Sequence, residues 1–174
     1  NKVTHAAGFS DSTIIISGSG SVILDRPLFG NETIMKFNLN TQDYEWISQA
    51  DNSRSYMRKF IYNADSSYLY SIGSIGRDAV VRKISTQEGA VAWNYTLDDP
   101  HFNIDDPLEI RLNPLTGHLT FIGYSFAIGR YLFADVIDTT GVRVGAFFNR
   151  SDFNNNIKKD LSFEILDDGG MILG

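Results

Sequence analysis

The chain has 174 residues, a formal net charge of −6 and no cysteine. The acidic balance disfavours a nucleic-acid or anionic-membrane partner, because too few cations are present to neutralise phosphates. The lack of cysteine excludes disulfides, thiolate catalysis and cysteine-ligated metals, and because no apolar run approaches the roughly 18 residues that span a bilayer, we expect no membrane span.

In chain order, the apolar residues come in short runs that are rich in Ile, Val, Phe and Tyr and are separated by Gly, Asn, Asp and Ser. This pattern predicts an all-β protein. A strand, a polar turn and a second strand occur four times, and each second strand ends at a glycine. These glycines are 50 to 55 residues apart: Gly18, Gly73, Gly123 and Gly174.

A second pattern lies between these hairpins. An apolar strand runs into Asn-Thr-Gln, Ser-Thr-Gln or Asp-Thr-Thr, and the next strand carries an aromatic residue. Two sets of positions are expected to be equivalent between repeats: Leu39, Ile84 and Ile137 before the turn, and Trp46, Trp93 and Phe148 after it. The offsets of the aromatics differ by even numbers, so we expect them to share one strand face and to fill the space between repeats.

Each repeat is therefore predicted to hold four antiparallel strands, in a single β-repeat domain that covers residues 1–174. The predicted repeats run over about 13–65, 66–116 and 117–168, with a lone strand at residues 2–9 and another at residues 171–174. Four-stranded repeats of this length are typical of β-propeller blades. A single meander cannot bury both of its faces, so we expect the blade-like repeats to stack.

Residues 67–97, SYLYSIGSIGRDAVVRKISTQEGAVAWNYTL, carry a family resemblance. They resemble the blade repeat of quinoprotein-like propellers and of secreted propeller repeats with an Asp-Gly-Gly turn. The matching residues are Asp168, Gly169, Gly170 and Gly174, and Gly73, Lys83, Gly89 and Trp93. One departure is an extra residue between Lys83 and Gly89, so we expect that turn to differ from the family pattern.

This resemblance implies blade architecture but carries no function by itself, because propellers include enzymes, receptors and scaffolds. Its dehydrogenase branch holds a quinone with a metal, acidic residues and often a vicinal disulfide. The chain has no cysteine, and no quinone ligand can be placed by motif. We therefore expect no cofactor, no catalytic residue and no enzymatic activity.

The most charged stretch, residues 98–107, contains four candidate Ca²⁺ ligands: Asp98, Asp99, Asp105 and Asp106. Clustered carboxylates and carbonyls are the ligands that Ca²⁺ prefers, and paired carboxylates also serve glycoside hydrolysis. The alternative is a solvated loop in which each Asp-Asp-Pro interrupts a strand. The EF-hand pattern is absent, so the solvated loop is the favoured interpretation.

Two other patterns suggest sites only superficially. The three histidines, His5, His101 and His118, lie in different repeats without a partner at metal-ligand spacing. Gly18-Ser19-Gly20 and the stretch from Gly73 to Gly76 look like phosphate loops, but no helix follows to supply a positive dipole end. We interpret the histidines as isolated residues and the glycines as turns.

Three N-glycosylation motifs begin at Asn31, Asn94 and Asn149. Asn94 and Asn149 each directly follow one of the aromatics predicted to face inward. We therefore expect them at equivalent, outward-facing positions of two repeats. Asn31 lies in a long insertion of the first repeat, and all three are expected to be exposed.

Open strands at both ends favour a non-enzymatic, extracellular structural or adhesive glycoprotein. Its terminal strands would pair with those of neighbouring subunits, giving an oligomer or, where the contact does not close, a filament. The alternative is a fragment of a larger soluble β-propeller, which acts as a ligand- or protein-binding module or as a quinoprotein-like oxidoreductase.

Overall fold

The computed structural model describes residues 2–19, 32–49, 55–97, 105–127, 129–151, 163–166 and 171–173. These residues form fourteen strands. The first sheet contains β1 (Lys2–Ser10), β2 (Thr13–Ser19), β3 (Glu32–Asn38) and β4 (Asp43–Gln49). The second contains β5 (Ser55–Tyr62), β6 (Tyr68–Ile75), β7 (Asp78–Ser85) and β8 (Val91–Thr96).

The third sheet contains β9 (Asp105–Leu112), β10 (Leu119–Ala127), β11 (Gly129–Ile137) and β12 (Arg143–Ser151). A two-stranded sheet follows, made of β13 (Phe163–Ile165) and β14 (Met171–Leu173). In the described part of the chain, no helix is long and apolar enough to cross a membrane.

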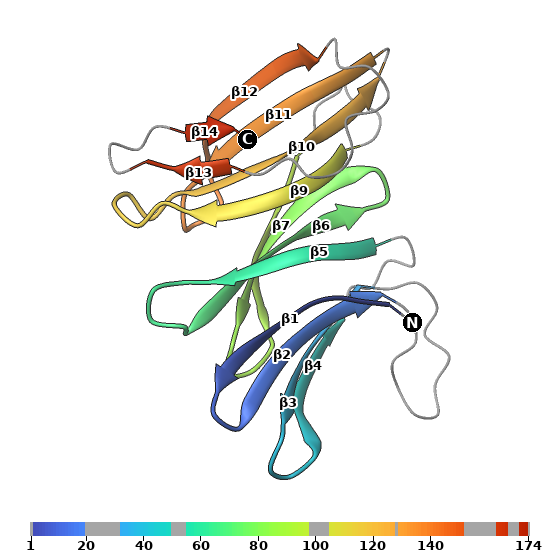
Figure 1. The fold of residues 1–174 in the computed structure, drawn as a ribbon, viewed down its shortest axis with the longest axis vertical. Coiled ribbons are helices and arrows are strands. Elements are labelled where there is room, and N and C mark those ends of the chain that lie inside the picture. The colour runs from blue at the N-terminus through green and yellow to red at the C-terminus, as the bar shows by residue number, and fades with distance from the viewer. Residues whose placement is uncertain are drawn as a thin grey trace.

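Strand order within each sheet follows the chain, and every neighbouring pair is antiparallel. Figure 1 shows the three four-stranded sheets arranged one after another in chain order, with the β13–β14 hairpin beside the third sheet. The predicted all-β class and the predicted four-stranded repeats are therefore confirmed.

The two terminal strands differ from the prediction. β1 is not alone, because it pairs with β2 and completes the first sheet, and β14 pairs with β13. The hydrogen-bonded sheets thus begin one strand earlier than the predicted repeats. The physical reason is local: a two-residue turn at residues 11–12 brings β1 directly onto β2.

The glycine on which the repeats align has a structural cause. In all three large sheets it lies opposite an irregularity in the register of the preceding strand, of the kind produced by a β-bulge. A Cβ on Gly73 would lie 2.0 Å from the backbone oxygen of Tyr56, and one on Gly123 would lie 2.5 Å from that of Asp106. Any side chain here would collide with the bulged strand, so only glycine fits.

The apolar core lies between successive sheets. The first sheet contributes Ile15, Ile34 and Trp46, which meet Met57, Phe60, Leu69 and Ile84 of the second. The next interface joins Tyr70, Ile72 and Val81 to Ile110, Phe121 and Phe133 of the third sheet. Beyond it, Ile122 and Ala134 pack on Phe163 of β13. Both faces of the second and third sheets are therefore used, as expected for stacked repeats.

Strand register corrects the predicted equivalence of Leu39. Phe37, rather than Leu39, is the register counterpart of Ile84 and Ile137. Leu39 lies in the turn after β3 and is 46% exposed, whereas Ile84 and Ile137 are buried. The Thr-Gln pair that both sequences contain suggested the wrong alignment. In the turn after β3 this pair lies two register positions later than in the turn after β7.

Register also corrects the prediction for Phe148. Trp46 and Trp93 occupy the same position in β4 and β8, but Gly145 occupies it in β12. Phe148 is three positions further along, opposite Phe133. The turn between β11 and β12 is one residue shorter than the other two. A count of residues from the turn therefore assigns the side chains of β12 to the wrong faces of the strand.

Candidate interaction site

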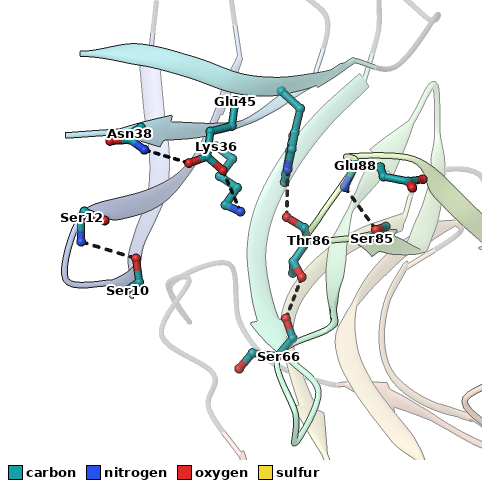
Figure 2. Close-up of polar contacts among 10 residues, drawn as sticks. Ser10, Ser12, Lys36, Asn38, Glu45, Ser66, Ser85, Thr86 and Glu88 are labelled. Atoms are coloured by element: carbon teal, nitrogen blue, oxygen red, sulfur yellow. Dashed lines mark hydrogen bonds and ion pairs between the residues drawn. The ribbon is translucent and has the colours of Figure 1, made fainter. Parts of the chain in front are cut away.

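Trp46 joins the first sheet to the second. Its indole N–H donates a 2.9 Å hydrogen bond to the backbone oxygen of Thr86, in the turn between β7 and β8. The Thr86 hydroxyl donates in turn to the backbone oxygen of Ser66, as Figure 2 shows. The ring lies on Gly89, where a Cβ would be 2.7 Å from ring carbons. The turn is therefore shaped to receive an indole.

Trp93 makes the same contact between the second and third sheets. Its N–H donates 3.0 Å to the backbone oxygen of Thr139, and its ring lies over Gly141. Gly89 and Gly141 both have left-handed backbones, with φ of 71° and 89°. We call this arrangement the tryptophan clamp: an indole on the fourth strand of one sheet, and a carbonyl and a left-handed glycine in the next sheet's turn.

The tryptophan clamp is incomplete at both ends of the described stack. In the first sheet, the register counterpart of Gly89 and Gly141 is Gln42, which has φ of 57°. Gln42 therefore has a side chain at the position where Gly89 and Gly141 have none and where the indoles lie. In the third sheet, Gly145 replaces the tryptophan. The clamp thus joins the three large sheets to one another, and the first sheet cannot receive a further sheet by the same contact.

Charged side chains join the first strands of the second and third sheets. Asp106 accepts a 2.7 Å hydrogen bond from the Tyr56 hydroxyl and forms a 3.0 Å ion pair with Arg58. Burial, and then the hydrogen bond to Asp106, raise the pKa of Tyr56 to about 12. Further along the same two strands, Lys59 of β5 forms an ion pair with Glu109 of β9. Because hydrogen bonds and ion pairs require a specific geometry, these contacts fix how the two sheets align across an interface that is otherwise apolar.

A third polar contact involves a fully buried carboxylate. Asp135 on β11 accepts a 2.6 Å hydrogen bond from the Tyr95 hydroxyl of the second sheet and a 2.8 Å contact from Arg143. Burial is the main cause of the raised pKa of Tyr95, and the hydrogen bond to Asp135 adds to it. Because both partners are hydrogen-bonded to it, the buried charge is compensated.

His5 lies on β1 at the start of the stack. Its ring meets Phe60 of the second sheet edge-on, at 4.6 Å between centroids. Burial, and then the charge of Lys59, lower the pKa of His5. His101 lies outside the described residues, and His118 lies in the turn before β10. The structure therefore does not bring His5 and His118 together.

The predicted Ca²⁺ ligands are only partly described. Asp98 and Asp99 lie outside the described residues, as does the side chain of Asp105 in β9. The carboxylate of Asp106 is engaged by Tyr56 and Arg58. Within the residues that the structure covers, no group of three or more His, Asp or Glu side chains could hold a metal ion.

Of the two glycine-rich stretches predicted as turns, most residues lie in strands: Gly18 and Ser19 belong to β2, and the stretch from Gly73 to Ile75 belongs to β6. Gly76, with φ of 65°, lies in the turn between β6 and β7 as predicted. Of the glycosylation motifs, Asn31 lies outside the described residues. Asn94 is exposed on β8, paired with Arg82. Asn149 lies on β12, opposite Leu132. Its register position is three residues beyond that of Asn94, so the two asparagines are not equivalent as predicted.

Among the described residues, the last sheet has two strands, whereas the other three have four. β14 pairs with β13 alone, whereas its counterparts β2, β6 and β10 have a strand on each side in the described chain. Ile172 in the middle of β14 is 56% exposed. Its register counterparts in β6 and β10, Ser71 and Phe121, are buried. β14 therefore offers both a hydrogen-bonding edge and an apolar side chain.

No protein-family model matches this chain, and no curated protein matches it. Among solved structures, it is similar to the 1.18 Å crystal structure of an uncharacterized protein from Listeria monocytogenes EGD-e, with a TM-score of 0.50 and 13% sequence identity. The match covers 95% of this chain and 47% of that one. The chain thus spans about half the length of the structure it matches, and at this identity the likeness concerns the fold alone.

Proposed function

We propose that the protein is a non-enzymatic, extracellular structural glycoprotein of propeller-like repeats, and that copies of it join through their terminal strands. The joining element is the edge of β14. Two antiparallel β14 strands from two copies would give a four-stranded sheet in the order β13–β14–β14–β13. This sheet would have the same number of strands as the other three.

The observation that carries this proposal is that the described β13–β14 sheet has two strands, beside three sheets that each hold four. The described charged groups support the structural part, because Asp106, Glu109 and Asp135 hold sheets or strands together. Stacking by the tryptophan clamp is not proposed for joining, because Gln42 replaces the clamp glycine in the first sheet and Gly145 replaces the clamp tryptophan in the third.

The contact would be symmetric. Ile172, the middle residue of β14, would face Ile172 of the other copy, so the contact closes on a dimer rather than continuing into a filament. Few backbone hydrogen bonds and one apolar pair form, so the dissociation constant is expected at about 10 µM to 1 mM.

Light scattering on the purified chain tests this contact. We expect the mass to rise from one chain toward two with increasing concentration. Ile172→Lys should stay at one chain, because it places two like charges directly opposite each other. Val144→Lys is the matched control, since Val144 is also an exposed apolar strand residue, on β12, and should associate like the unaltered protein. A mass of one chain at every concentration would overturn the proposal.

A second candidate function is a binding module within a larger soluble propeller. It is favoured by the match to only 47% of a longer chain. In that case, following strands of the same polypeptide would fill the β14 edge. Its oxidoreductase form would require a quinone or metal in the purified protein, which mass spectrometry and elemental analysis detect.

A further inference from the structure

The outermost strand of the second sheet lacks the charged side chains that the outermost strands of the other two large sheets carry. Each large sheet leaves one edge at its fourth strand. β4 carries two exposed carboxylates, Asp43 and Glu45, and β12 contains two arginines, Arg143 and Arg150. The sequence of β8, VAWNYT, contains no charged residue and no proline.

Such an edge favours pairing with other chains. β8 is rich in strand-forming residues, and Val91 at its start is 43% exposed. Uncharged, exposed strands of five to seven residues are templates for edge-to-edge association, and natural proteins block them with charge, proline, bulges or a cover. β8 has a register irregularity near its start, but β4 and β12 have the same one and carry charged residues in addition. β8 therefore lacks the charge that the other two outermost strands have.

The glycosylation motif lies on this strand. Asn94 and Thr96, its first and third residues, are both exposed. Asn94 is paired with Arg82, and Trp93 beside it packs on the third sheet. Asn94 is exposed and lies on the strand face opposite to that of Trp93, outside the interface that Trp93 occupies.

We propose that Asn94 carries an N-linked glycan and that this glycan guards the edge of β8 against pairing with another strand. The inference rests on the proposed extracellular location. A lipid-diphosphate-linked oligosaccharide is the donor. The bond between its first sugar carbon and the diphosphate breaks, a bond from that carbon to the Asn94 amide nitrogen forms, one amide proton is lost, and the lipid diphosphate leaves.

The glycan would act through size and hydration. It is bulky and hydrophilic, and it sits near the middle of a six-residue strand. A second strand could not approach β8 without desolvating the sugar. The edge of β14 stays open, because the described residues of β13 and β14 contain no glycosylation motif. Association of copies is thereby confined to β14.

The test uses protein secreted from eukaryotic cells and the matched pair Thr96→Ala and Thr96→Ser. The alanine variant destroys the motif, whereas the serine variant keeps it. All variants also carry Ile172→Lys, so that the proposed β14 contact is absent. Intact mass reports the glycan, light scattering reports association, and thermal unfolding reports folding.

We expect one glycan mass at residue 94 in the parent and in Thr96→Ser, and its loss in Thr96→Ala. The Thr96→Ala variant should form larger species with an unchanged melting temperature. An unoccupied Asn94, or a glycan whose loss leaves the mass at one chain, would overturn the proposal. Failure of the β14 contact appears separately, in the comparison of the unaltered protein with Ile172→Lys.

Discussion

Asp135 shows how single residues join the sheets of this molecule. It is fully buried, and its counterpart by register on the preceding sheet, Arg82, is buried too. Asp135 lies within the apolar run LFADVI and was not singled out from the sequence. Its contact with Tyr95 was not predicted either, because the two residues are 40 positions apart and meet only when the sheets stack.

At the same scale, His5 makes stability depend on pH. Its ordinary pKa is 6.5, and burial and Lys59 lower the pKa in the folded protein. The folded state therefore favours the neutral ring. Its contribution to stability is complete above pH 6.5 and is lost as the pH falls from 6.5 through the lowered folded value.

Urea unfolding at pH 7.5 and pH 5.0 measures this loss. We expect the unaltered protein to lose more unfolding free energy between the two values than His5→Gln, which cannot titrate there. Carboxylates titrate alike in both proteins, so their effect cancels in the comparison. An equal loss in both proteins would show that His5 is not responsible.

At the scale of the element, the hairpins could be predicted from the sequence, but which residues occupy equivalent positions in different repeats could not. Strands and tight turns follow from local chemistry: in the turn after β5, the Asn63 side chain accepts from the backbone of Tyr68, and Ser66 takes φ of 58°. Equivalences between repeats depend on turn length and bulges. Leu39 and Phe148 were misplaced for that reason, whereas Trp46 and Trp93 were placed correctly on one face.

The tryptophan clamp gives the prediction at this scale. Gly89→Ala combines a left-handed backbone with a Cβ 2.7 Å from the Trp46 ring. Gly76→Ala is the matched control, because Gly76 has a similar φ of 65° and nothing within 4 Å of its Cβ. We expect the control to cost about 1–2 kcal/mol from the backbone alone. Gly89→Ala should cost about 2–4 kcal/mol, because the indole must also move.

Chemical denaturation gives both free energies, and tryptophan emission supplies a second readout. The emission should shift to longer wavelength in Gly89→Ala as Trp46 becomes exposed, and should stay unchanged in Gly76→Ala. Equal costs for the two variants, with no shift in emission, would mean that the turn does not clamp the indole.

At the scale of the whole molecule, the stack is directional and its two ends differ. The sequence predicted stacking, because four-stranded repeats cannot bury both faces alone. The repeated hairpin pattern included the β1–β2 and β13–β14 hairpins, but the predicted repeat boundaries assigned the two strands of each hairpin to different repeats. Those pairings removed the two lone complementary strands that the sequence suggested, and they left the edge of β14 as the candidate for contact between copies.

Amide hydrogen exchange at β14 tests that contact most directly, because a strand added to its edge would protect the outward backbone amides. Exchange of residues 171–173 is measured at low and high protein concentration, beside Ile172→Lys under the same conditions. We expect slower exchange at high concentration in the unaltered protein and no such change in Ile172→Lys. Equal exchange at both concentrations in the unaltered protein would contradict joining through β14.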